Sequence, residues 1–263
     1  MRILVANDDG IHSPGIAMLA RVATQFGDVR VVAPDVEQSS ASHAITSSRP
    51  LSYRAATNLP GIEAYRVNGT PADCVALGVH NWKDVDLVLS GVNIGVNLGN
   101  GMWHSGTLAA AKQATLFGLR GIALSTPSAR RGGGEPDFDA LAPHVADVLG
   151  RLLPLTDARL LNVNLPPSPR GMMWTRQAVR HYDGKIVPDE DPMGRRHFWF
   201  TVVPIDETER GTDLWAMERG YISVTPLSVD LTDHAALEHL SRDHPLAEPS
   251  AEEEQAESVE EDE

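Results

Sequence analysis

Two adjacent aspartates, Asp8 and Asp9, are the residues whose type and position point most directly to chemistry. They follow Arg2–Ala6, a short apolar run that predicts a buried β-strand. Ligands in open α/β sheets bind just beyond the carboxyl ends of strands. Neighbouring carboxylates repel each other unless a proton or a cation neutralises them, and Mg²⁺ and Mn²⁺ take oxygen ligands of this kind. The pair therefore indicates a divalent-metal site, with an Asp-Gly turn carrying solvated acids as the alternative.

A glycine-rich run from Ser90 to Thr107 is the second segment with chemical potential. Its glycines let backbone N–H groups approach a ligand closely. Ser105, Gly106 and Thr107 open an expected helix, where free N–H groups and the helix dipole favour phosphate. The run predicts a small phosphate pocket, and a tight connector between a strand and a helix is the alternative.

The same run matches neither of two standard nucleotide motifs. Gly101 and Gly106 have the spacing of a P-loop, but Thr107 stands where that motif has lysine. Three earlier glycines are spaced by four residues, which differs from the Gly-x-Gly-x-x-Gly of dinucleotide-binding folds. ATP-type and dinucleotide binding are therefore not expected.

Two further polar loops follow expected strands. The loop from Pro34 to His43 carries several hydroxyls that could supply a neutral oxygen ligand, although a plain surface loop is the default interpretation. In Asn68–Asp73, Thr70 as N-cap and Pro71 as the first helical residue form a good helix start. That structural reading is sufficient for the second loop, although a helix N-terminus also suits an anion.

Three larger side chains in these loops have open roles. His43 and His104 are candidates for protonating a leaving group or orienting water. An incidental polar role is the alternative for each histidine. Trp103 either stacks on a base or packs in the protein, and the sequence does not separate these two roles.

The elements that position these residues alternate between strand and helix in the first half of the chain. Expected strands are Arg2–Ala6, Val29–Ala33, Tyr65–Val67, Asp86–Ser90, Ile122–Ser125 and Leu160–Leu165. Expected helices are Pro14–Phe26, one opening at Thr70, Ser105–Phe117 and Phe138–Leu153. This order predicts an α/β fold, a Rossmann-like and mostly parallel sheet with flanking helices. The polar loops should then gather along one edge of the sheet.

The second half reads as a β-rich extension over about residues 166–243. Its expected strands are Met172–Arg176, His197–Val203 and Tyr221–Val224, with a turn-rich loop at Asp183–Arg195 and helices near Thr212–Arg219 and His234–Leu240. The long connections predict arms that pack on a partner subunit. We expect one domain over residues 1–243 and a disordered acidic tail over residues 244–263.

Charge and composition exclude several classes. The net charge of −14 is concentrated at the end of the chain, where residues 248–263 contain nine acids and no Lys or Arg. The rest has 27 acids against 22 bases, which argues against duplex nucleic acid as the main ligand. No apolar run is long enough for a membrane span and no signal peptide is visible. Cys74 is the only cysteine, so we expect no disulfide and a cytoplasmic location.

These segments together resemble the SurE survival-protein family of metal-dependent nucleoside-monophosphate phosphatases. The resemblance rests on motifs that occur in order along about residues 1–242. They are Asn7-Asp-Asp-Gly-Ile-His-Ser-Pro-Gly15, Val32-Ala-Pro-Asp35 with Gln38-Ser39, Gly69-Thr-Pro-Ala-Asp-Cys74, Ser90-Gly-Val-Asn93, Asn97-Leu-Gly99, His104-Ser-Gly-Thr107, Asp191-Pro-Met-Gly194, Gly211-Thr-Asp213 and Gly220-Tyr-Ile-Ser-Val-Thr-Pro-Leu227 with Asp230. No single motif is decisive, but their number and order make the match specific.

The resemblance implies a site, a cofactor and an assembly. The implied ligands of one divalent cation, Mg²⁺ or Mn²⁺, are Asp8, Asp9, Ser39 and Asn93. The family also implies a domain-swapped homodimer or tetramer. Two departures from the family pattern, at Ser40 and at Asn100-Gly101, touch none of these four residues. They put substrate preference and loop mobility in doubt, not metal binding.

The main hypothesis is hydrolysis of a nucleoside 5′-monophosphate, with 3′-nucleotides and short polyphosphate as further substrates. Asn97, Ser105, Gly106 and Thr107 would cradle the phosphate, and catalysis would come from positioning and electrostatics. A metal-activated water is the preferred nucleophile, and attack by Asp8 is the alternative. One rival is a nucleotide sensor or single-strand-binding protein whose metal only holds the ligand. The other is a different metal-dependent hydrolase, acting on polyphosphate or on a substrate of deacetylase type. A deacetylase would more naturally use zinc histidines, and no His-x-x-x-His pair occurs near Asp8.

Overall fold

The computed structural model describes residues 1–128, 136–179, 184–202 and 208–244. Contacts divide the chain into two units, Met1–Val229 and Asp230–Glu263. The described part of the second unit contains helix α6, His234–Asp243, which Asp233 caps. The extent of a single domain over residues 1–243 stays a prediction.

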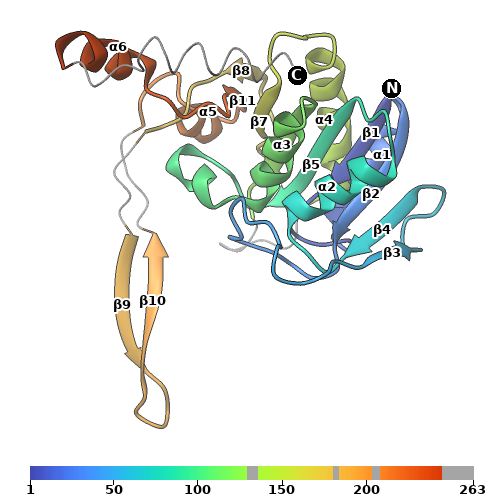
Figure 1. Ribbon diagram of the computed structural model, residues 1–263, viewed down its shortest axis with the longest axis horizontal. Helices are drawn as coiled ribbons and strands as arrows, with labels where there is room; N and C mark the ends of the chain where they lie inside the picture. Colours follow the sequence, from blue (N-terminus) through green and yellow to red (C-terminus); the bar gives the residue numbers. More distant parts are fainter. Residues whose placement is uncertain (129–135, 180–183, 203–207, 245–263) are drawn as a thin grey trace, which may run out of the picture. The chain divides into compact units, whose positions relative to one another are not determined.

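A mixed sheet of nine strands, counted over the described residues, organises the first unit (Figure 1). Its strand order is β3-β4-β2-β1-β5-β6-β7-β11-β8. The bounds are β1 Arg2–Ala6, β2 Asp28–Pro34, β3 Tyr53–Ala56, β4 Glu63–Val67, β5 Leu87–Ile94, β6 Arg120–Thr126, β7 Leu160–Asn164, β8 Met172–Trp174 and β11 Ile222–Leu227. The strands from β4 to β7 in this order run parallel, whereas β3 and β11 run antiparallel to their neighbours β4 and β7. The α/β fold and the mostly parallel sheet expected from the sequence are confirmed.

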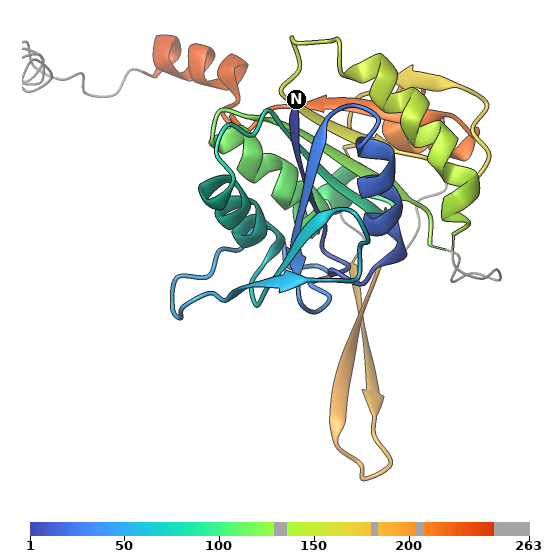
Figure 2. The same cartoon turned by 90° about the vertical axis from the view of Figure 1, so that its right-hand side faces the viewer.

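Helices cover both faces of this sheet, as Figures 1 and 2 show. Helices α1 (Pro14–Ala23) and α4 (Phe138–Leu152) pack together on one face, and α2 (Pro71–Asn81) and α3 (Gly106–Leu116) pack together on the other. A large apolar core lies under α1 and α4, and a smaller one lies under α2 and α3. Burial of these apolar side chains holds the helices against the two faces of the sheet.

Short polar residues define where the helices begin. Ser13, Thr70, Ser105 and Asp137 each accept a hydrogen bond from a backbone N–H of the first turn of the helix that follows. Thr70 and Asp73 form a complete capping box. The helix starts read from the sequence are confirmed by these caps.

The sequence reading was wrong at three elements. Asp183–Arg195, expected as a loop, contains strand β9 (Gly184–Glu190), which pairs antiparallel with β10 (Arg196–Val202). Strand β3 was missed, and a 3-10 helix, η1 (Gly99–His104), lies within the glycine run. Pro, Gly and charged residues give β9 a low strand propensity, so only its pairing with the aromatic β10 makes it a strand. Residues 183 and 203, also in these predictions, lie outside the described residues.

The β-rich extension joins the main sheet only in part. Strands β8 and β11 extend the sheet beyond β7, whereas β9 and β10 pair only with each other within the described residues. A short helix, α5 (Asp213–Glu218), precedes β11 and packs against it.

In the part of the chain that the structure describes, no helix combines the length and apolar character that a bilayer crossing requires.

Candidate active site

The carboxyl ends of β1 and β5 place the aspartate pair at the centre of the sheet edge. Strand β1 lies between β2 and β5 and runs parallel to both. The chain leaves β1 toward β2 on one side, and β5 lies on the other side. This reversal of direction is a topological switch point, where open α/β sheets bind ligands. Asp8 and Asp9 therefore stand at the position in the fold best suited to a ligand.

Asp8 is packed against the start of helix α3. Its side chain is only 5% exposed, and its Oδ1 accepts a hydrogen bond from Thr107 Oγ1 at 2.7 Å. A Cβ atom on Gly106 would lie 2.8 Å from Asp8 Cβ and 3.0 Å from Asp8 Oδ2. Only glycine at position 106 allows the helix to approach this closely. The structure thus brings Asp8, Gly106 and Thr107 together.

Asp9 lines a cavity of about 500 Å³ beside this contact. The Ile94 N–H donates to Asp9 Oδ2 at 3.2 Å, which links the end of β5 to the aspartate pair. The Gln38 N–H donates to the Asp8 carbonyl at 2.8 Å, which holds the loop after β2 against the same strand end. The residues lining the cavity are Asp9, Ser13, Pro14, Glu37, Ser39, Ile94 and Ser128.

Burial and neighbouring negative charges raise the pKa values of both aspartates. Burial is the main cause of the raised pKa of Asp8, and the hydrogen bonds that oppose it do not cancel it. Burial raises the pKa of Asp9 to about 6, with further contributions from the charges of Asp8 and Glu37. Three carboxylates therefore share this region without an opposite charge among the causes of these shifts. Such a site gains free energy by binding a cation.

Ser39 and Asn93, the other two expected metal ligands, are placed differently. Ser39 lines the cavity and donates its hydroxyl hydrogen to Glu37 Oε1. Asn93 Nδ2 donates to the Gly95 carbonyl at 2.6 Å, so Oδ1 is the atom with which Asn93 would meet a cation. No group of three or more His, Cys, Asp or Glu side chains in the described part of the chain is arranged to hold a metal. A four-ligand site thus needs the serine and asparagine oxygens.

A local irregularity in β5 determines where Asn93 lies. The pairing of β5 with β6 shifts register between Ser90 and Asn93. Gly91 adopts φ +131°, and a Cβ there would lie 2.2 Å from the Leu124 carbonyl oxygen of β6. Bulges of this kind re-aim side chains next to functional sites.

The side chains of Asn97 and Ser105, expected at the phosphate, are bonded inside the protein. Asn97 Nδ2 donates to Ser125 Oγ at 2.8 Å and to Thr107 Oγ1 at 3.4 Å. Ser105 Oγ accepts from the Leu108 N–H at 3.0 Å and so caps α3. In this arrangement Asn97 and Ser105 hold the glycine-rich run and the start of α3 in position.

Two buried asparagines that the sequence reading missed hold Asn97 by its backbone. Asn164 Oδ1 accepts from the Asn97 N–H at 2.8 Å. Asn162 Nδ2 and Asn164 Nδ2 both donate to the Asn97 carbonyl, at 2.8 and 3.0 Å. The available signal was two asparagines at alternate positions in an apolar strand, which places both on one face. Glu37 also received no role from the sequence, although its loop was singled out.

His43, His104 and Trp103 lie where two of the polar loops meet. His43 Nε2 hydrogen-bonds to Gln113 Oε1 of α3 at 2.9 Å. The Ser42 N–H donates to the His104 carbonyl at 3.2 Å, and the Ser42 hydroxyl donates to the Trp103 carbonyl at 2.8 Å. Trp103 is 54% exposed. The structure assigns no catalytic role to these three residues.

Comparison with known proteins gives one consistent result. The family model described as "Survival protein SurE" matches residues 3–184. The 5′-nucleotidase SurE 1 of Thermus thermophilus is 48% identical over 248 residues, covering 92% of this chain and 97% of that protein. The 5′-nucleotidase SurE of Deinococcus radiodurans is 46% identical over 240 residues, covering 88% of each. The crystal structure of the SurE protein from Aquifex aeolicus matches with a TM-score of 0.78 and 35% identity, covering 92% of this chain and 99% of that one.

Proposed function

The chain belongs to the SurE family, and on that premise we propose that it is a metal-dependent 5′-nucleotidase. The reaction is hydrolysis of the phosphomonoester of a nucleoside 5′-monophosphate. Similar proteins that cover most of this chain are named as 5′-nucleotidases. The observation that carries the proposal is the aspartate pair with raised pKa values, packed against the start of α3.

The residues present fit one divalent cation with a preference for oxygen, Mg²⁺ or Mn²⁺. Asp8 and Asp9 supply two carboxylates, Ser39 a hydroxyl and Asn93 an amide oxygen. All four are hard oxygen donors, which is the ligand type these ions select. When bound, such a cation polarises a phosphate and offsets charge on the departing oxygen.

Helix α3 supplies the phosphate-binding part of the site. Its first turn, at Gly106 and Thr107, carries backbone N–H groups and the positive end of the helix dipole. Thr107 Oγ1 ties this turn to Asp8, so phosphate and cation positions are fixed relative to each other. Catalysis comes from this positioning and from electrostatic stabilisation of the transferring group.

A water molecule is the nucleophile in this proposal. Asp8 is almost fully buried, and its Oδ1 accepts the Thr107 hydroxyl hydrogen, which suits a residue that holds rather than attacks. Asp9 lines the open cavity and is better placed to orient a water. Recovery of phosphorylated Asp8 from an enzyme quenched during turnover would replace water by the aspartyl-phosphate route.

We also propose 3′-nucleotides and short polyphosphate as further substrates, and a domain-swapped homodimer or tetramer as the assembly. A pocket that binds the phosphate rather than the base accepts several phosphate esters.

Strands β9 and β10 expose large apolar side chains, with Phe198 65% and Trp199 59% exposed. Exposed apolar surface of this kind is typical of an interface. Light scattering of wild type and of the double variant Phe198→Ser, Trp199→Ser tests the assembly, and an unchanged mass contradicts it.

The experiment for the activity is a phosphate-release panel. AMP, GMP, a 3′-nucleotide and tripolyphosphate are compared with Mn²⁺, with Mg²⁺ and with EDTA. We expect release from nucleoside 5′-monophosphates that requires the added metal. Binding of AMP without phosphate release would favour the rival hypothesis of a nucleotide sensor. Full activity in EDTA contradicts the metal site.

A further inference from the structure

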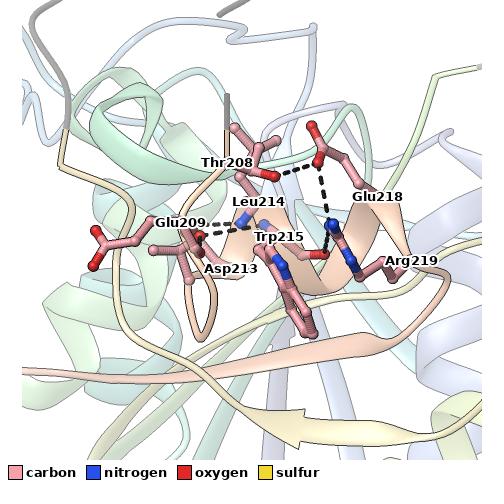
Figure 3. Close-up of polar contacts among 8 residues, drawn as sticks. Thr208, Glu209, Asp213, Leu214, Trp215, Glu218 and Arg219 are labelled. Atoms are coloured by element: carbon pink, nitrogen blue, oxygen red, sulfur yellow. Dashed lines mark hydrogen bonds and ion pairs between the residues drawn. The ribbon is translucent and has the colours of Figure 1, made fainter. Parts of the chain in front are cut away.

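Asp213, the first residue of helix α5, is a fully buried carboxylate far along the chain from the aspartate pair. Its relative exposure is 0%. Figure 3 shows α5, whose ends are held by polar contacts: Thr208 Oγ1 donates to Glu218 Oε2 at 2.6 Å and Arg219 donates to the Trp215 carbonyl at 3.3 Å. Thr212 caps the helix by accepting from the Trp215 N–H. These contacts cap α5 and tie it to the residues that directly precede it.

The Asp213 carboxylate accepts hydrogen bonds from three segments of the chain. Oδ1 accepts from the Leu214 N–H of its own helix at 2.8 Å and from the Ala178 N–H at 3.0 Å. Oδ2 accepts from the Gly99 N–H in the glycine run at 2.8 Å. A buried carboxylate costs several kcal/mol to desolvate unless donors compensate it, so this arrangement is stable only while all three segments stay in place.

Both backbone polar groups of Gly99, in the glycine run, are hydrogen-bonded to side chains. Gln177 Nε2 donates to the Gly99 carbonyl at 3.1 Å, while Asp213 accepts from its N–H. Gly99 has φ +52°, and a Cβ there would lie 2.7 Å from the Ala178 carbonyl oxygen. This part of the glycine run thus packs against α5 and against the segment around Ala178.

Hydrogen bonds connect the glycine run near Gly99 to the candidate active site. Two residues before Gly99, Asn97 donates to Thr107 Oγ1, and Thr107 in turn donates to Asp8 Oδ1. Asn162 and Asn164 hold the Asn97 backbone from strand β7. Gly99 therefore lies two residues from Asn97, whose side chain contacts the first turn of α3.

We propose that Asp213 is a positioning residue for the glycine-rich run: by holding the Gly99 N–H, it keeps Asn97 and Thr107 in register with Asp8. This role rests on the proposed nucleotidase function. It is a role for the C-terminal part of the chain, which supplies none of the proposed metal or phosphate ligands. Asp213 does not touch the substrate.

Asp213→Asn removes the hydrogen bond between the Gly99 N–H and the side chain of residue 213. In the favoured orientation the amide oxygen of asparagine still accepts from Leu214 and Ala178, and its NH₂ group then faces the Gly99 N–H, so that two donors oppose each other. The matched control is Thr175→Val, which deletes a buried side-chain hydrogen bond to Thr225 in the same part of the chain but no bond to the glycine run. Gly99→Ala is the second variant, because it disturbs the same contact from the loop side.

The measurements are steady-state hydrolysis of AMP with Mn²⁺, calorimetric titration with Mn²⁺, and hydrogen exchange of the peptide containing Gly99. For Asp213→Asn and Gly99→Ala we expect kcat/KM to fall by about 10-fold to 100-fold with a raised KM for AMP. Exchange at Gly99 accelerates, while the Mn²⁺ affinity stays within about threefold, since Asp213 contacts none of the four proposed ligands. Thr175→Val should retain the wild-type KM.

If Asp213→Asn and Gly99→Ala lower only the apparent kcat and leave the KM for AMP unchanged, the variants have merely lost folded protein. That result would overturn the positioning role. The same conclusion follows if Asp213→Asn and Gly99→Ala both match Thr175→Val in KM and in exchange at Gly99. If the wild type releases no phosphate from AMP under any metal condition, the nucleotidase proposal itself fails and the positioning role fails with it. These outcomes separate the two claims.

Discussion

At the scale of single residues, two carboxylates lie close together where water solvates them poorly. Asp9 has a pKa raised to about 6 because of burial, the charge of Asp8 and the charge of Glu37. A metal needs deprotonated carboxylates, so protons compete with the cation for this site. The competition has a definite pH range.

We predict that Mn²⁺ affinity of the wild type falls as the pH drops through about 6. Below that pH the affinity should fall by about tenfold per pH unit as Asp9 is protonated. Calorimetric titration between pH 5 and 8 measures this. A constant affinity across the range would show that Asp9 is not a ligand.

Removing the negative charge of Asp9 by the substitution Asp9→Asn should stabilise the metal-free protein. The folded-state pKa of Asp9, about 6, exceeds the ordinary value of 3.8, so the folded protein binds this proton more tightly than the unfolded chain. Stability from this group is present at low pH and is lost as the pH rises from about 4 through 6. In EDTA at pH 7.5 we expect Asp9→Asn to be more stable by about 1 kcal/mol, allowing for the partial exposure of the side chain.

The stability gain should be visible in urea unfolding and should shrink toward zero near pH 4. The asparagine retains an oxygen that can accept the Ile94 N–H, so no other contact is lost. A less stable variant at pH 7.5 contradicts the electrostatic account.

At the scale of elements, the close approach of α3 to β1 makes the site. Gly106 is the contact point, because any side chain there would meet Asp8 and Pro71. We predict that Gly106→Ala lowers kcat/KM for AMP about 100-fold while circular dichroism shows the helices intact. Gly101→Ala is the matched control: it lies in the same run, where a Cβ has open space, and should retain near-normal activity. Equal effects of the two variants would refute the role of this contact.

Most elements that position the site could be read from the sequence. Strand β1 and the helix starts at Ser13, Thr70 and Ser105 follow from an apolar run and from capping chemistry, both of which are local. Strand β9 could not be read, because its pairing with β10 rather than its own residues makes it a strand.

The missed site residues have the same physical explanation. Asn162, Asn164 and Asp213 act through hydrogen bonds to the glycine run over separations of 65 to 114 residues. No local pattern encodes such pairs. The sequence could indicate that buried asparagines in a strand are unusual, but not which backbone groups they hold.

At the scale of the whole molecule, the strong negative charge belongs to the end of the chain. Without residues 248–263 the chain has 27 acids and 22 bases. We predict that deleting these residues leaves Tm and kcat for AMP unchanged at physiological salt, since the segment has few apolar side chains to bury. The truncated protein should elute earlier from an anion exchanger and be less soluble. A lower Tm or kcat would show that the segment has a structural or catalytic role.

We propose that Asp8 and Asp9 at the end of β1 form the metal centre of a nucleotidase. The most direct test of this proposal is the Mn²⁺-dependent rate of phosphate release from AMP by wild type, Asp9→Asn and the control Asp86→Asn, whose carboxylate lies at the start of β5, at the opposite edge of the sheet. We expect a rate for Asp9→Asn at least about 100-fold below that of the wild type and a rate for Asp86→Asn close to that of the wild type. Equal rates for Asp9→Asn and the wild type would contradict the proposal.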